Sequence, residues 1–399
     1  MKEQLKNRFL FMLYAIIIGA LTGLIVWSFL KIMNISIKFI WETIPNMIEI
    51  PFYTIIVCTI GGIIIGVWKK FNGDYPEDLE EVMSKVKKDG GYPYNNIGKL
   101  SISAILPLIF GGSIGPEAGL TGVIAGLCTW IGDKFKYLFK EMKELTQIGI
   151  SATLGTIFNS PMFGFVAPIE SEENINIPKK SKTIIYFLAI FGAFGIIILL
   201  NHLFNTTTGM PSFNSLEIGK KEWLLLIPLS IIGIIGGYMY ILTNKMTQKI
   251  SNPLQKFPVL KCITAGLILG ILGTLLPYTM FSGEHQIEEI MKNWKEIGLI
   301  ILLLTAIIKL FITNVCINLG FKGGHFFPCI FSGICLGYAL SIVLPIDPVF
   351  SVIVITTSLI SFLMNKPFAT VLLLMIIFPI EAIPVMILSA VIGSMIKFK

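Results

Sequence analysis

The chain has 399 residues, of which 54% are hydrophobic and only 14% are charged. Soluble domains carry about 25% charged residues, and several windows of this chain exceed the roughly 18 apolar residues that cross a bilayer. The composition therefore excludes an ordinary soluble protein and predicts an integral membrane protein, with the plasma (inner) membrane as its expected location. The net charge of +7 does not indicate nucleic-acid binding, because the lysines lie mostly in loops between apolar runs.

Apolar segments recur along the whole chain and predict an all-α polytopic membrane protein. The first segment, residues 9–32, is long enough to span a bilayer and lacks a small-residue cleavage site, so we interpret it as a transmembrane helix rather than a signal peptide. The remaining apolar segments are 52–68, 100–131, 146–169, 184–204, 223–242, 259–281, 297–320, 326–346 and 348–397. The last segment is too long for one helix and is interrupted by asparagine and proline residues.

The polar connections predict the orientation. The N-terminal tail and the loop at 69–97 are both rich in lysine and are separated by two predicted spans, so both lie on one side. The positive-inside rule places that side, and with it the N-terminus, in the cytoplasm. We expect a single transmembrane domain over residues 1–399, with no appended soluble domain. The six cysteines form no C-x-x-C pair and H-E-x-x-H is absent, so we expect buried thiols, no metal site and no cofactor.

Two pairs of helix breaks indicate an internal repeat. GGSIGPEAG at 111–119 and GGHFFPCIFSG at 323–333 each place a Gly-Gly pair four or five residues before a proline. About forty residues later a second break follows in each case, FNSPMFG at 158–164 and MNKPFAT at 364–370. Corresponding interrupted segments are typical of transporters built from two related halves, which would here be roughly 1–200 and 201–399.

These breaks have the chemistry of an anion site. Pro116 and Pro328 suit the first turn of a helix, so the residues before them lie at the positive end of a helix dipole. Glycine lets the backbone approach a ligand closely, and a helix N-terminus attracts an anion without a full positive charge. Inside a membrane such backbone persists only where it is buried in protein or lines a wet cavity. The alternative is that the glycines pack helices and the kink is incidental.

The interrupted segments resemble the signature motifs of the CLC family of chloride channels and proton-coupled anion antiporters. GDYPE at 73–77, GSIGPE at 112–117, FNSPMFG at 158–164 and GGHFFP at 323–328 carry the resemblance, which covers roughly residues 10–397. It implies an inverted-repeat subunit, usually dimeric, with broken helices that meet at mid-membrane and one pore for chloride or a related anion. The residues that the resemblance assigns to anion binding are Gly73, Gly112, Ser113, Ile114, Gly115, Gly324, His325 and Phe326.

The chain departs from the family pattern at three positions. Ile114 stands where the family has a glutamate that acts as gate and proton carrier. Gly73 stands where the family has an anion-coordinating serine, and Ser171 stands where it has a proton-relay glutamate, although Glu170 is one residue earlier. An isoleucine can neither compete with an anion nor carry a proton, so the sequence favours passive conduction.

A second interpretation keeps proton coupling. Glu117 lies in the first helical turn after the proline, where the dipole favours a carboxylate, so it is either a structural acid or a substitute gate. Glu170 and His325 are further candidate proton sites, and His325 is alternatively a packed histidine. Lys309 and Lys366 interrupt apolar runs and would either attract anions to the vestibules or reach the membrane boundary.

A remote alternative comes from the pattern G-x-S-x-G in GGSIG, which would make the chain an intramembrane serine protease. Ser113 would be the nucleophile, with His325 or His202 as its base. Pro116 follows the motif at once, and the partner segment GGHFFP has no serine. We therefore predict an anion transporter that is not an enzyme.

Overall fold

A computed structural model describes residues 2–134, 142–167, 170, 180–205, 211–213 and 215–396. The regular elements in these ranges are helices, and strand-type pairing is limited to isolated bridges such as that between Gly115 and Gly324. Seven helices of the described part are long and apolar enough to cross a membrane. The prediction of an all-α polytopic fold is confirmed.

The chain forms two compact units that are interleaved in sequence. Unit one comprises Met1–Ile35, Pro76–Ile102 and Glu117–Gly209, and unit two comprises Ser36–Tyr75, Ser103–Pro116 and Met210–Lys399. Two helices, α1 (Lys2–Lys38) and α5 (Ile97–Ile109), cross from one unit to the other. These boundaries do not follow the sequence midpoint, and the division into two related halves stays a prediction.

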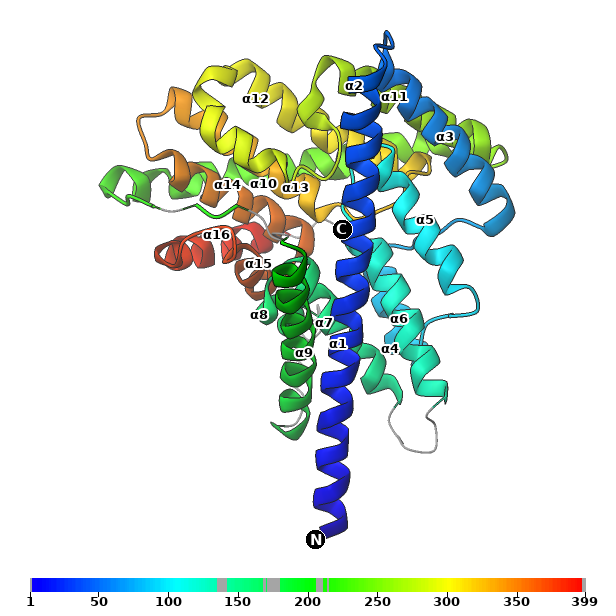
Figure 1. Ribbon diagram of the computed structural model, residues 1–399. Coiled ribbons are helices and arrows are strands. Elements are labelled where there is room, and N and C mark those ends of the chain that lie inside the picture. The colour runs from blue at the N-terminus through cyan, green and yellow to red at the C-terminus, as the bar shows by residue number, and fades with distance from the viewer. Residues whose placement is uncertain are drawn as a thin grey trace. The chain divides into compact units, whose positions relative to one another are not determined.

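Unit one is built mainly from α1 and five helices: α4 (Leu79–Asp89), α6 (Glu117–Lys134), α7 (Met142–Ile157), α8 (Pro161–Val166) and α9 (Lys180–Phe204). Figure 1 shows α9 beside α1. Small residues allow this approach, because a methyl group at Gly19 would lie 1.9 Å from the Ala189 carbonyl oxygen. Gly23 and Ala193 repeat the contact one turn later. Close backbone packing through small residues is the usual way in which helices associate in a membrane.

Unit two contains the remaining helices, which are η1 (Phe39–Thr43), α2 (Ile44–Met47), α3 (Tyr53–Asn72), α10 (Lys220–Ser251), η2 (Asn252–Leu254), α11 (Pro258–Leu275), η3 (Pro277–Thr279), α12 (Gln286–Leu319), α13 (Phe326–Val343), α14 (Pro348–Met364), α15 (Pro367–Leu374), η4 (Ile380–Ala382) and α16 (Ile383–Met395). Figure 1 shows α3 alongside α11, a pair that packs through glycines in the same way as α1 and α9. A methyl group at Gly266 of α11 would lie 2.2 Å from the Cys58 carbonyl oxygen of α3. The centre of unit two is α13 and α14, whose residues are almost all buried.

Several apolar segments that read as continuous in the sequence are divided in the structure. The segment at 100–131 becomes α5 and α6 with the loop 110–116 between them, and 348–397 becomes α14, α15 and α16. Proline begins α8, α14 and α15, because its fixed φ suits the first helical turn. Two irregular loops of unit two follow from these breaks, residues 110–116 and residues 320–325, and they form the candidate site.

Candidate functional site

The two broken segments meet through a backbone bridge in unit two. The Gly115 N–H donates to the Gly324 carbonyl oxygen at 2.8 Å, and the Gly324 N–H donates to the Gly115 carbonyl oxygen at 2.8 Å. The loops 110–116 and 320–325 are therefore paired antiparallel. Because each glycine amide already has a carbonyl partner, these two amides shape the site and do not face an open cavity.

Ile114 fills the space at this meeting point. Its side chain is fully buried, and a methyl group at Gly323 would lie 2.5 Å from Ile114 Cδ1. The Ile114 N–H donates to the Gly112 carbonyl oxygen at 2.8 Å, and the Gly112 N–H donates to the Pro107 carbonyl oxygen at 2.9 Å. The loop therefore holds an apolar side chain, and no titratable one, against the partner loop.

Ser113 is attached to α12. Its hydroxyl lies 3.2 Å from Thr313 Oγ1, and Thr313 in turn donates to the Lys309 carbonyl oxygen at 2.8 Å. The serine thus presents a hydroxyl, which can donate to an anion, and the partner of this hydroxyl is a threonine rather than a histidine.

The second loop leads into α13. His325 is the N-cap residue of this helix and Phe326 is its first residue, so the positive end of the α13 dipole faces the loop. The His325 ring stacks on Tyr240 with a centroid distance of 5.4 Å and lies 4.5 Å from the Phe326 ring centroid. This aromatic packing agrees with the interpretation of His325 as a packed histidine.

Gly73 lies at the end of α3, where the chain turns. Its φ of 94° is in the region that favours glycine, and its N–H donates to the Lys69 carbonyl oxygen at 2.9 Å. The next residue, Asp74, forms ion pairs with Lys69 at 2.7 Å and with Lys322 at 2.9 Å. Burial of the Asp74 carboxyl would raise its pKa, but the two lysine ammonium groups hold that pKa well below its usual range.

The sequence analysis did not identify this ion cluster. Lys69 and Asp74 are five residues apart around the end of a helix, and Lys322 precedes the Gly-Gly pair of the second loop. An acid directly after Gly73 and a lysine directly before Gly323 were the available signals. Neither signal predicts that the end of α3 and the loop 320–325 lie close enough for Lys69 and Lys322 to share the Asp74 carboxylate.

The remaining candidate acids belong to unit one. Glu117 is the first residue of α6 and is buried, and its backbone carbonyl accepts a bond of 2.6 Å from Thr121 Oγ1. Glu170 is also buried, whereas Ser171 lies outside the described residues. His202 is an exposed residue near the end of α9.

Lys309 is neither a vestibule lysine nor a boundary lysine. It is fully buried, and its Nζ donates to the backbone carbonyls of Met280 at 2.7 Å, Phe281 at 2.8 Å and Tyr278 at 3.3 Å. It therefore binds the loop between α11 and α12. Lys366 is half-buried as the N-cap residue of α15.

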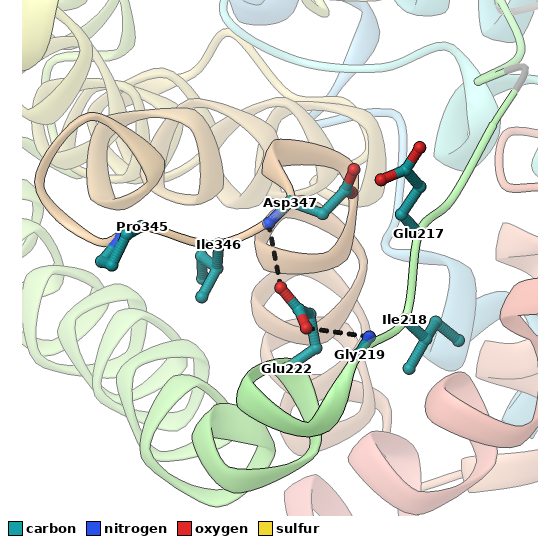
Figure 2. Close-up of a pocket in the computed structure, with 7 residues that line it drawn as sticks. All are labelled: Glu217, Ile218, Gly219, Glu222, Pro345, Ile346 and Asp347. Carbon is teal, nitrogen blue, oxygen red and sulfur yellow. Dashed lines mark hydrogen bonds between the residues drawn. The ribbon is translucent and has the colours of Figure 1, made fainter.

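A separate cavity of about 470 Å³ lies in unit two at the start of α10 and α14. Figure 2 shows Glu222 accepting hydrogen bonds from the backbone of Gly219 at 2.8 Å and of Asp347 at 3.4 Å. Burial and the charge of Glu217 raise the pKa of Asp347. Three carboxylates line this cavity and none of the predicted anion-binding residues does, so its charge disfavours an anion.

Comparisons with known proteins show which proteins this chain resembles. A family model described as "Voltage gated chloride channel" matches residues 61–397. The protein YfeO of Escherichia fergusonii, whose name proposes a role in ion transport, is 25% identical over 358 residues, which cover 86% of this chain and 82% of YfeO. The structure is similar to a CLC-type fluoride/proton antiporter, with a TM-score of 0.81, 19% identity and coverage of 97% and 95% of the two chains. It is also similar to a slow cyanobacterial Cl−/H+ antiporter, with a TM-score of 0.80, 17% identity and coverage of 96% and 93%.

Proposed function

Because this chain belongs to the voltage-gated chloride channel (CLC) family, whose model matches residues 61–397, we propose that it conducts a small inorganic anion passively through one pore per subunit. Members of this family transport anions as channels or as proton-coupled antiporters and are not enzymes. Membership therefore removes the protease alternative, and the question that remains is whether protons move with the anion.

Ile114 is the observation that carries the proposal. A proton-coupled mechanism needs a titratable group that reaches the anion, and the fully buried side chain where the two loops meet is an isoleucine. The histidine in the second loop packs against Tyr240 and Phe326. Within unit two, the position that the resemblance assigns to the gate therefore carries no proton, which supports passive conduction.

We assign the predicted anion-binding residues to two roles. Ser113 supplies a hydroxyl, and the amides of His325 and Phe326 lie at the positive end of α13. The other assigned residues instead determine the path of the backbone. Their amides bond to backbone carbonyls in the cases of Gly73, Gly112, Ile114, Gly115 and Gly324, and the Ile114 side chain also fills the space between the loops. The site is thus built from few donors, which suits an ion that must also leave.

A proton-coupled antiporter is the second candidate function. The two similar solved structures are named as proton antiporters, and Glu117 is a buried carboxylate in the first turn of α6. An acid buried within a membrane protein is a functional candidate. In this mechanism Glu117, Glu170 or His325 would replace the missing gate.

We further propose that the subunits form a homodimer in the plasma (inner) membrane, with the N-terminus in the cytoplasm. The lysine-rich loop at 69–97 supports this orientation.

Anion efflux from liposomes loaded with chloride, and in a parallel preparation with fluoride, tests the proposed function. Valinomycin lets potassium ions balance the charge that chloride carries out, and an electrode records the external pH at the same time. We expect chloride efflux without proton movement. Proton uptake in proportion to efflux would instead support the antiporter, and Glu117→Gln would then be expected to abolish the proton flux. The absence of both chloride and fluoride efflux would overturn both candidate functions.

A further inference from the structure

Three charged side chains of unit two meet at the end of α3. Lys69 Nζ lies 2.7 Å from Asp74 Oδ1, and Lys322 Nζ lies 2.9 Å from Asp74 Oδ2. Each carboxylate oxygen therefore binds a different ammonium group. Two lysines and one aspartate leave the cluster with a net charge of +1.

Exposure differs strongly within the cluster. The side chain of Lys69 is 5% exposed and that of Lys322 is 26% exposed, whereas that of Asp74 is 58% exposed. The cations are thus the inner members, and the acid can move into water. A buried charge that loses its partner destabilises a protein strongly, so another anion has to take the place of a departing Asp74 carboxylate.

The cluster connects two segments that the family resemblance assigns to anion binding, the end of α3 at Gly73 and the loop 320–325. Asp74 follows Gly73 directly, and Lys322 directly precedes Gly323. The backbone at Gly320, with a φ of 112°, comes so near that a methyl group there would lie 3.9 Å from Lys69 Nζ and 2.4 Å from Cys262 Sγ. Gly73 has no hydroxyl to offer an anion at this end of α3, while the two ammonium groups beside it do offer donors.

We propose that Lys69 and Lys322 form a second anion-binding site, which takes a small inorganic anion such as chloride or fluoride in exchange for the carboxylate of Asp74. The exchange conserves charge, because one monovalent anion replaces another between the same two ammonium groups. Its role in conduction rests on the proposed function, whereas binding itself can be measured separately.

The exchange needs no proton. Burial would raise the pKa of Asp74, but the ammonium groups of Lys69 and Lys322 hold it well below its usual range, so the carboxylate stays charged at neutral pH. Cys262 is the other titratable group that faces Lys69. Asp74 therefore does not titrate between about pH 6 and pH 8, because its pKa lies below its ordinary value of about 3.9.

Halide binding to the purified full-length protein in detergent tests the site. Chloride and fluoride titrations would be followed by calorimetry, with sodium gluconate holding the ionic strength constant. We expect Asp74→Asn to lower the apparent Kd about ten-fold or more, because a competitor that occupies the site nine-tenths of the time reduces affinity by that factor. Adding Lys322→Gln to Asp74→Asn should reverse the gain. Glu77→Gln is the matched control, because Glu77 is in the same GDYPE segment but pairs with Lys85 instead, and its Kd should equal that of the wild type.

An Asp74→Asn protein with an unchanged or higher Kd would overturn the proposal. If Asp74→Asn does not fold, Lys322→Gln alone decides, because it should weaken halide binding several-fold, and a wild-type Kd would reject the site. The two proposals fail separately. If the protein binds halide in this pattern but passes no anion across liposome membranes, the second site is supported and the proposed conduction is refuted. If the protein conducts anions but Asp74→Asn does not change the Kd, the proposed conduction is supported and the second site is refuted.

Discussion

Shortening Ile114 is expected to speed anion conduction, because its side chain fills the point where the two loops meet. The side chain is fully buried and packs against Gly323. Removing one buried methyl group in Ile114→Val should destabilise the fold by about 0.5–1.5 kcal/mol, and Ile114→Ala by about 2–5 kcal/mol. If an anion must displace the same carbons during conduction, the substitution also lowers the free-energy barrier to conduction by part of that amount. Each reduction of about 1.4 kcal/mol in this barrier speeds conduction about ten-fold.

Chloride efflux per folded protein, measured in liposomes, checks this expectation, and thermal denaturation reports stability. The order of efflux should be Ile114→Ala, then Ile114→Val, then wild type, with the alanine variant at least about ten-fold faster than wild type. Ile353→Val and Ile353→Ala are matched controls, because Ile353 of α14 is also fully buried. They should reproduce the loss of stability without a change in efflux. Equal efflux from the Ile114 and Ile353 variants would refute the assignment of Ile114 as an obstruction.

Three further predictions concern the surroundings of the site. Gly323→Ala should slow efflux and lower stability, because the new methyl group would lie 2.5 Å from Ile114 Cδ1. Adding Ile114→Ala should restore at least part of the efflux and of the stability, and additive effects of the two substitutions would contradict the contact. Lys309→Met should lower the thermal midpoint, because three backbone carbonyls lose their donor at about 1 kcal/mol each. An unchanged midpoint would show that these carbonyls find other partners. Asp347→Ala should cost about 1 kcal/mol through loss of the bond from Phe350 N–H that caps α14, and Asp347→Asn should retain most of it. Burial and the charge of Glu217 raise the pKa of Asp347, so protonated Asp347 stabilises the folded state at low pH. This stabilisation is lost as pH rises from the ordinary pKa of aspartate through the raised pKa. Parallel curves of stability against acid pH for the wild type and Asp347→Asn would contradict this sign.

The fold could be predicted from the sequence because its determinants are local. Apolar length predicts membrane helices, and a Gly-Gly pair followed by proline predicts a helix end and a new helix start. The structure places breaks at 110–116 and 320–325, as these patterns predict. Local patterns also explain the division of 348–397, since Pro367 begins α15, Pro379 precedes η4 and Pro384 lies in the first turn of α16.

The details of the site could not be predicted, because they depend on contacts between distant residues. The sequence offered Lys309 two solvent-facing roles, but its partners are backbone carbonyls, which have no sequence signature. Asp74 and Lys322 are 248 positions apart, so no periodicity joins them. The resemblance likewise assigned Gly115 and Gly324 to anion binding, whereas the mutual pairing of their backbone groups is visible only when both loops are placed in space.

That mutual pairing bears on how an anion could pass. An unsatisfied backbone group within a membrane costs several kcal/mol, so two broken helices that depended on an anion for all their bonds would hold it tightly. Gly115 and Gly324 instead satisfy two donors and two acceptors between themselves. The loops therefore keep their shape without an ion, and an anion meets a preformed site with few remaining donors. Binding that is specific but weak is what rapid conduction requires, and the same reasoning explains why an isoleucine, rather than a charged gate, is compatible with the paired loops.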